Sequence, residues 1–219
     1  MSVGLGIKVC DLVTPGTIGY REAVELQERF VQAAARGESE KLILLEHPHV
    51  ITLGRGFHAE NLLFSTEWLR ENGVAVEESG RGGDVTYHGP GQVVGYPILN
   101  ISDRPDLHLY LRNLEEWMIR CVGDFGIQAG RKPGLTGIWV NDEKIGAIGV
   151  RVSRWITSHG FALNVNTDLT RFEYIVPCGI RQHGVTSMQK LLNRPIPMEQ
   201  VHRSLIHHFE NIFQRKVNS

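Results

Sequence analysis

The feature that most constrains the fold is the stretch GIWVNDEKIGAIGVRV at residues 137–152. Two apolar runs flank the polar residues Asn141, Asp142 and Glu143, which is the pattern of a β-hairpin. Strand-like runs recur before and after it, at residues 41–47, 50–55, 74–79, 85–87 and 159–166. Because hairpins recur among helical segments, the sequence predicts an α+β fold, in which a mixed or largely antiparallel sheet packs against helices.

Four segments have the apolar spacing or the capping residues of helices. Ser65 is a suitable N-cap for a short helix, and Gly126 follows the end of a long one. In the longer segments, apolar residues recur three and four positions apart, as they do on one face of a helix. We expect helices over residues 17–35, 65–72, 106–125 and 198–217.

Composition places the chain among soluble globular proteins. It has 219 residues, 42% of them hydrophobic and 21% charged, with no Pro/Gly/Ser-rich linker and no repeat, so we expect a single domain over residues 1–219. The formal net charge of −1 argues against broad capture of nucleic acid or anionic membranes. The N-terminus lacks a secretory signal pattern, and the longest apolar runs are too short to span a bilayer.

The three cysteines, Cys10, Cys121 and Cys178, lie far apart and form no Cys-x-x-Cys pair. This spacing fits neither a disulfide framework nor a zinc finger, and it suits a reducing compartment. We therefore expect a cytoplasmic protein, with Cys10 and Cys121 packed as structural residues.

Residues 78–99 are unusually rich in glycine, with six glycines inside sixteen residues. An ordinary hairpin with glycine turns explains the glycines, but it does not explain why Arg81, Tyr87, His88 and Gln92 share the stretch. The pattern is neither G-x-x-x-x-G-K-[ST] nor a G-x-G-x-x-G entering a helix, so it does not predict a nucleotide site of either kind. Glycine lets backbone approach a ligand closely, which makes this stretch a candidate binding loop.

Lys144 precedes two glycines in an apolar strand. A lone lysine is usually a solvated residue at a strand edge. A lysine that enters an apolar, glycine-lined strand can instead be partly desolvated, which suits acid–base chemistry. His159 is more easily read as a core histidine than as a ligand, and the ten histidines lack the spacing of a zinc site, so we predict no metal.

Cys178 lies in the stretch IVPCGIRQHGVTS, residues 175–187. Buried, inert cysteine is the common case. However, Pro177 and Gly179 favour a sharp turn, and a thiolate stabilised by a nearby cation is a competent nucleophile. Lys144, His88 and His159 are all possible partners, and the residues alone do not choose among them.

Four segments together resemble the lipoyl(octanoyl) transferases in order and approximate spacing. The resemblance implies a biotin/lipoate protein ligase-like catalytic domain, a mixed β-sheet packed against helices. It also implies transfer of an octanoyl or lipoyl group from an acyl carrier protein thioester to a lysine of lipoyl-dependent enzyme domains. The segments are RGGDVTYHGPGQ (81–92), KIGAIGVR (144–151), HGFALNV (159–165), and PCGI (177–180) followed by VTS (185–187).

The resemblance also implies roles for particular residues. Cys178 matches the family's acyl-enzyme cysteine, and Lys144 matches its catalytic partner. No metal and no cofactor are implied, because the acyl group arrives on the phosphopantetheine of the acyl carrier protein. The implied acceptors are the lipoyl domains of 2-oxoacid dehydrogenases and the glycine cleavage H protein. The implied substrate-binding residues are Arg81, Gly82, Gly83, Asp84, Val85, Thr86, Tyr87, His88, Ala147, Ile148, Gly149, Gly160, Phe161 and Ala162.

Three alternatives remain open. An ATP-dependent lipoate or biotin ligase would share the fold, but it needs no nucleophilic cysteine and the sequence has no evident ATP loop. An amidotransferase would take its acyl group from one lipoyl domain and pass it to another, and the sequence does not decide the donor. A catalytically inactive domain that binds acylated carrier proteins is disfavoured by the presence of both Cys178 and Lys144.

Overall fold

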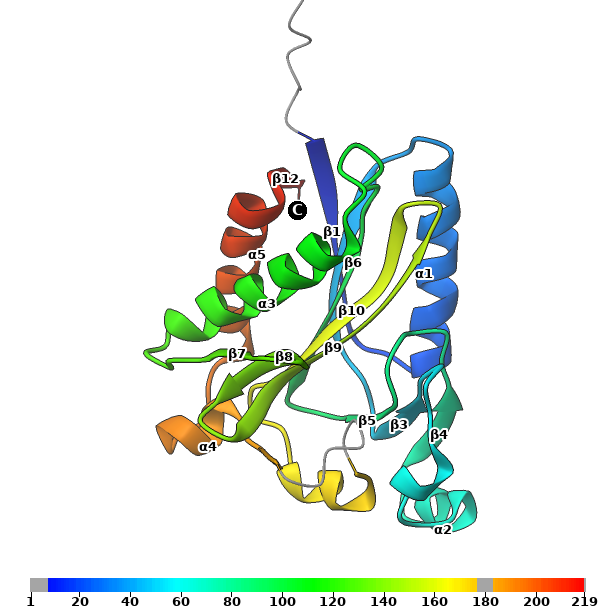
Figure 1. Ribbon diagram of the computed structural model, residues 1–219, viewed down its shortest axis with the longest axis vertical. Coiled ribbons are helices and arrows are strands. Elements are labelled where there is room, and N and C mark those ends of the chain that lie inside the picture. Colours follow the sequence, from blue (N-terminus) through cyan, green and yellow to red (C-terminus); the bar gives the residue numbers. More distant parts are fainter. Residues whose placement is uncertain (1–7, 177–182, 219) are drawn as a thin grey trace, which may run out of the picture.

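A computed structural model describes residues 8–176 and 183–218. A large mixed sheet runs through the molecule with helices on both of its faces (Figure 1). Its strands lie in the order β12-β1-β2-β6-β10-β9-β8-β7, and β11 pairs with β9. They are β1 (Lys8–Thr17), β2 (Glu40–Glu46), β6 (Gln92–Ile98), β7 (Gly130–Lys132), β8 (Leu135–Val140), β9 (Glu143–Ser153), β10 (Ile156–Asn164), β11 (Gly184–Val185) and β12 (Arg215–Asn218).

The predicted hairpin over residues 137–152 is confirmed as β8 and β9. The two strands pair antiparallel, and Asn141 takes a φ of 51° in the turn between them. Neighbouring strands from β2 to β7 are all antiparallel, whereas β1 pairs parallel with both β2 and β12. The mixed sheet predicted from the recurrent hairpins is therefore confirmed.

Strand β2 shows why both faces of the sheet are covered. Successive side chains of a strand point to opposite faces, so Leu42 and Leu44 enter one apolar core while Ile43 and Leu45 enter another. The first core is closed by α3 (Leu107–Gly123) and α5 (Met198–Phe213). The second is closed by α1 (Tyr20–Ala35), on the opposite side of the sheet in Figure 1.

The predicted helices form, with differences at their ends. Ser65 caps α2 (Thr66–Glu71) by accepting a hydrogen bond from the Trp68 N–H, as the sequence predicts. A fifth helix, α4 (Met188–Leu192), was not predicted.

The prediction that the last helix extends to residue 217 is wrong. Helix α5 ends at Phe213, Gln214 takes a left-handed φ of 54°, and the chain then becomes strand β12 beside β1. The Arg215 guanidinium donates hydrogen bonds to the buried carboxylate of Glu40, which fixes this strand at the edge of the sheet.

A smaller three-stranded sheet lies beside the large one. It comprises β3 (Val50–Leu53), β4 (Ala75–Glu78) and β5 (Val85–His88), in the order β4-β3-β5. Its core includes side chains from α2 and from the 3-10 helix η2 (Leu169–Tyr174), together with Leu62, which follows the 3-10 helix η1 (Ala59–Asn61). The glycine-rich stretch joins this sheet to the large one, because the Gly82 N–H donates to the carbonyl of Val150 in β9.

Within residues 8–176 and 183–218, no helix combines the length and the apolar character needed to cross a membrane.

Candidate functional site

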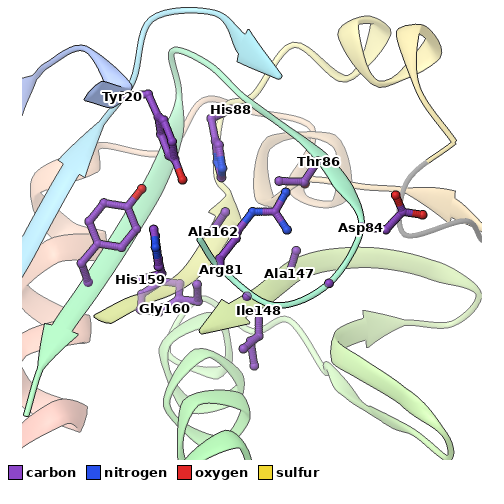
Figure 2. Close-up of a pocket in the computed structure, with 14 residues that line it drawn as sticks. Tyr20, Arg81, Asp84, Thr86, His88, Ala147, Ile148, His159, Gly160 and Ala162 are labelled. Atoms are coloured by element: carbon purple, nitrogen blue, oxygen red, sulfur yellow. The ribbon is translucent and has the colours of Figure 1, made fainter. Parts of the chain in front are cut away.

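An apolar pocket lies where the glycine-rich loop meets β9 and β10 (Figure 2). Most of the predicted substrate-binding residues line it, from three separate segments of the sequence. They are Arg81, Gly83, Asp84, Thr86, His88, Ala147, Ile148, Gly149, Gly160, Phe161 and Ala162. The structure adds Tyr20, Tyr96 and His159 to this lining.

The pairing of β9 with β10 brings two of these segments together. Ala147, Ile148 and Gly149 pair with Ala162, Phe161 and Gly160 respectively, so one patch of the large sheet forms a wall of the pocket. Glycine is required at one of these positions for packing reasons. A Cβ on Gly149 would lie 2.9 Å from Arg81 Cδ and 3.0 Å from the Gly82 carbonyl oxygen. The glycine-rich loop therefore reaches the sheet only because residue 149 has no side chain.

Arg81 holds the loop in place from within. Its side chain is buried, and its Nη2 donates to the backbone oxygen of Thr52 at 2.6 Å and to Oγ1 of the same residue at 2.9 Å. Its Nη1 donates to the Gly82 carbonyl at 3.1 Å. The guanidinium thus ties the loop to strand β3.

Three of the predicted binding residues lie outside the pocket lining. Strand alternation explains two of them: Thr86 and His88 face the pocket, while Val85 and Tyr87 point into the core of the small sheet. The Tyr87 hydroxyl shares a 2.7 Å hydrogen bond with Nδ1 of His49. Gly82 contributes through its backbone contact with β9.

Lys144 lines a smaller pocket next to the apolar one. The two pockets share Thr86, Ala147 and Ala162, so Lys144 lies at one end of the apolar pocket. Its side chain is only 8% exposed, and Nζ lies 4.8 Å from the centre of the Trp139 ring. This cation–π contact stabilises the ammonium in a site with little water.

Cys178 lies outside the described residues, so its distance from Lys144 stays a prediction. The chain is described again from His183, and its next residues run alongside Lys144. Gly184 and Val185 form β11 beside Glu143 and Lys144, and the Thr186 N–H donates to the Lys144 carbonyl at 2.9 Å. Val185 also lines the Lys144 pocket.

The other two cysteines are buried in the main core, as the sequence predicts. Burial raises the pKa of the Cys121 thiol to about 12, and it raises that of Cys10 further. Both thiols are therefore protonated and inert at neutral pH.

A line of buried hydrogen bonds connects His88 to the strand beside Lys144. His88 Nδ1 lies 2.7 Å from Gln92 Oε1, and Gln92 Nε2 donates to Asn164 Oδ1 at 2.9 Å. Gln92 Nε2 also donates to the Tyr87 carbonyl, and Asn164 Nδ2 donates to the Thr186 carbonyl. We call these three side chains, His88, Gln92 and Asn164, the amide relay.

The amide relay fixes the protonation of His88. A backbone carbonyl can only accept, so the carbonyls of Tyr87 and Thr186 fix which end of each amide donates. Gln92 must then accept from His88, which puts the imidazole proton on Nδ1 and leaves Nε2 as an acceptor. Complete burial lowers the pKa of His88 well below its usual value, so the ring is neutral at physiological pH.

Sequence patterns predict no substrate-binding role for several residues of this site. Tyr20 and Tyr96 carry no local signal, because one begins a helix and the other lies within a buried strand. Gln92 was noted but given no role. His159 repeats the His-Gly pair of residues 88–89, and that repetition was the available signal.

Among the residues that the structure describes, no cluster of three or more His, Cys, Asp or Glu side chains is arranged to hold a metal ion.

Comparison with known proteins identifies the family. Residues 19–210 match the family described as the lipoyl protein ligase A/B catalytic domain. An octanoyltransferase of Solibacter usitatus is 52% identical over 206 residues, which cover 93% of each chain. An octanoyltransferase of Rubrobacter xylanophilus is 51% identical over 201 residues, or 90% of each chain.

Solved structures agree on the fold. Lipoate-protein ligase A bound with ATP superposes with a TM-score of 0.77 at 17% identity, covering 98% of this chain and 88% of that one. Biotin protein ligase from Aquifex aeolicus gives a TM-score of 0.55 at 11% identity, covering 95% and 70%. The predicted biotin/lipoate ligase-like fold is confirmed. The chain belongs to the lipoyl protein ligase A/B catalytic domain family and, within it, to the octanoyltransferases.

Proposed function

We propose that this protein transfers an octanoyl group from a thioester on acyl carrier protein to a lysine ε-amine, through an acyl-enzyme on Cys178. The observation that carries the proposal is an apolar pocket with buried Lys144 at one end. The octanoyltransferases that share about half of its residues support the same reaction.

The spacing between the Lys144 end of the pocket and His159 suits an eight-carbon chain. Ala147 lies where the two pockets meet, and Val150, opposite His159, lies three residues further along β9. At about 3.3 Å per residue, this run of strand covers about 10 Å. An extended octanoyl group is about 9 Å long, since each of its C–C bonds of about 1.5 Å advances about 1.3 Å along the zigzag chain. Its acyl carbon would then lie beside Lys144 and its methyl end beside His159.

The first step forms the acyl-enzyme. The Cys178 thiolate attacks the thioester carbonyl, a new C–S bond forms, and the bond to the pantetheine sulfur breaks. Lys144, as an ammonium, gives a proton to the departing thiol. One thioester replaces another, so this step is close to thermoneutral and needs no ATP.

The second step makes the amide. The acceptor lysine attacks the acyl carbon, the bond to Cys178 breaks, and the thiolate is restored. Lys144, now a neutral amine, accepts the proton that the incoming amine loses, which returns it to the ammonium form. Amide formation from a thioester is downhill, so it drives the transfer forward.

The pocket walls supply the binding energy. Each methylene that leaves water contributes about 0.8 kcal/mol. Ala147, Ile148, Phe161 and Ala162 present mainly apolar surface to the chain. No cofactor enters this proposal, because the donor carries its own activated acyl group.

We propose as partners octanoyl-acyl carrier protein, the lipoyl domains of 2-oxoacid dehydrogenases, and the glycine cleavage H protein. A solved lipoate protein ligase from Thermoplasma acidophilum, 17% identical to this chain, is described together with its E2 lipoyl domain, which supports the choice of acceptor. Nucleic acid and membranes are not proposed as partners. Location in the cytoplasm stays a prediction.

The test is a transfer assay with octanoyl-acyl carrier protein, a lipoyl domain and no ATP. We expect Cys178→Ala to abolish transfer and Lys144→Ala to slow it by about 10²-fold or more, the usual contribution of a general acid–base group. Lys132→Ala is the matched control, because Lys132 also lies over the Trp139 ring but outside both pockets, and it should keep full activity.

Two further arms separate the alternatives. Octanoate with ATP replaces the acylated carrier in one, and an octanoylated H protein replaces it in the other. Transfer that requires ATP would identify a ligase. Transfer from the octanoylated H protein but not from acyl carrier protein would identify the amidotransferase.

A further inference from the structure

The apolar pocket ends at His159. Along the paired strands, Ala162 lies opposite Ala147 at the Lys144 end, and His159 lies opposite Val150 three residues away. The Tyr96 ring lies edge-on to His159 with 6.1 Å between ring centres. Figure 2 shows His159 and Tyr20 on the side of the pocket away from Asp84.

A second cavity lies beyond His159, between α1 and the β9–β10 hairpin. Val24, Gln27 and Val31 of α1 line it, together with Arg151 and Ile156. Among the described residues, only His159 lines both this cavity and the apolar pocket. Its imidazole therefore stands between two hollow spaces that would otherwise adjoin.

The backbone holds His159 in this place. The residue takes a φ of 55°, in the left-handed region that favours glycine. Its N–H donates to Gln27 Oε1 at 2.7 Å, which anchors strand β10 to α1. This backbone conformation and the hydrogen bond to Gln27 together fix where the imidazole lies.

The far end of the pocket is also polar. Nδ1 of His159 and Nε2 of Gln27 are buried and have no hydrogen-bond partner among the described residues. Desolvation lowers the pKa of His159 to about 4, so the ring is neutral at pH 7. An alkyl chain that reached this end of the pocket would meet polar atoms in place of apolar wall, so its further methylenes would gain little binding energy there.

We propose that His159 sets the acyl-chain length by closing the pocket at the eighth carbon. The proposal rests on the proposed function, since it assigns the acyl carbon to the Lys144 end. A shorter chain leaves part of the apolar wall uncovered. A longer chain meets the imidazole ring and the polar groups behind it.

The test compares carrier proteins loaded with C8, C10, C12 and C14 acyl groups on the wild type and on His159→Gly. Glycine suits the left-handed backbone and removes the ring, so the two cavities join. We expect the ratio of C12 to C8 kcat/KM to rise at least tenfold in the variant. An unchanged ratio in a folded, active variant would overturn the proposal.

Arg154→Gly is the matched control. Arg154 has a φ of 50° and is exposed in the turn between β9 and β10, so the substitution brings the same backbone relief away from both cavities. Its chain-length profile should equal that of the wild type. If it shifts toward C12 as much as that of His159→Gly, backbone relief explains the effect and the proposal fails.

His159→Asn provides a second variant, because asparagine tolerates a positive φ and is smaller than histidine. It should show a smaller shift in the same direction, and no shift in either variant contradicts the proposal.

Binding of free C8 to C14 carboxylates, measured by calorimetry, separates this inference from the proposed function. It reports pocket depth without any transfer. Suppose that the wild type does not transfer octanoyl but binds carboxylates longer than C8 more weakly, and that His159→Gly removes this weakening. The proposed function would then be wrong, and the role of His159 in setting pocket depth would stand. If the wild type transfers octanoyl but His159→Gly shows the same loss of affinity beyond C8 as the wild type, the role of His159 is wrong and the proposed function stands.

Discussion

Gln92 is a residue whose donor and acceptor ends can be tested separately. Replacing it with glutamate keeps the acceptor for His88 but removes the donor to Asn164 and to the Tyr87 carbonyl. Two buried acceptors lose their partner, which should lower the free energy of unfolding by about 1–3 kcal/mol. The new carboxylate should also raise the pKa of His88, because it favours the imidazolium. NMR titration of the His88 ring measures this shift.

Gln200→Glu is the control for Gln92→Glu. It makes the same change of charge at an exposed position of α5 and should leave both quantities unchanged. An unaltered His88 titration in Gln92→Glu would show that the amide relay does not govern the imidazole.

His159 makes the stability of the protein depend on pH. Its pKa is about 4 in the folded state, below the usual histidine value of about 6.5, mainly because burial disfavours the charged ring. As the pH falls from 6.5 to 4, the unfolded chain binds a proton that the folded chain does not, so the free energy of unfolding falls. A shift of this size corresponds to about 3 kcal/mol across that window, and stability is independent of this group above it.

Urea unfolding at pH 4.5 and 7 measures the effect. His159→Asn should reduce the difference between the two pH values by about 2–3 kcal/mol, the share of this one group, while His88 and the other histidines with lowered pKa keep theirs. Equal pH dependence in the two proteins would show that His159 does not remain neutral in the folded state.

Strands β6 and β10 approach each other closely, and this approach depends on glycine. A Cβ on Gly160 would lie 2.1 Å from the Gly95 carbonyl oxygen, which belongs to the backbone and cannot rotate away. Gly160→Ala should therefore force the two strands apart and destabilise the protein by about 3 kcal/mol. The same movement would distort the pocket wall and slow acyl transfer.

Gly130→Ala is the matched control, since a Cβ there meets no atom within 4 Å. Thermal unfolding of the two variants gives the comparison. A Gly160→Ala protein as stable as Gly130→Ala would contradict the close approach of β6 and β10.

The elements that the sequence predicted are those with local causes. The hairpin of β8 and β9 follows from a polar turn between apolar runs, and α2 follows from a capping serine. Strands β1, β6, β7, β11 and β12 were not predicted. Strand β6 lies in the stretch interpreted as a candidate binding loop, and β7 has only three residues. Strands β1, β11 and β12 pair in parallel, and no turn signal in their own residues marks that pairing. For the same reason α5 was extended through residues that form β12.

The residues of the site also fall into those with a local sequence signal and those brought together only by tertiary contacts. The motif segments identified most of the pocket lining, because loops and strands keep such residues together in sequence. The contribution of Tyr20 and Tyr96 is tertiary: α1 and β6 bring them to His159, and no local pattern predicts that meeting. Strand alternation also separates Val85 and Tyr87 from their neighbours in the same motif.

At the scale of the whole molecule, the ion pair between Glu40 and Arg215 joins the end of the chain to the large sheet. The carboxylate and the guanidinium are both largely buried, with Nε 2.8 Å from Oε2. Arg215→Met would leave the Glu40 charge buried without its partner, and we expect a loss of about 3 kcal/mol in the free energy of unfolding. Because neither residue lines the apolar pocket, transfer activity at 25 °C should be retained.

Arg203→Met is the control for this prediction. Arg203 pairs with Glu199 on the exposed face of α5, where loss of an ion pair costs at most about 1 kcal/mol. Denaturant unfolding should separate the two variants clearly. Equal stabilities would show that β12 contributes little to the sheet.

The proposed transfer depends on a covalent octanoyl-enzyme on Cys178, formed without ATP. The most direct measurement is the intact mass of the protein after incubation with octanoyl-acyl carrier protein alone, followed by addition of a lipoyl domain. We expect a single octanoyl adduct that maps to Cys178, is absent in Cys178→Ala, and moves to the lipoyl domain when that is added. An adduct on another residue, or transfer without any adduct on Cys178, would contradict it.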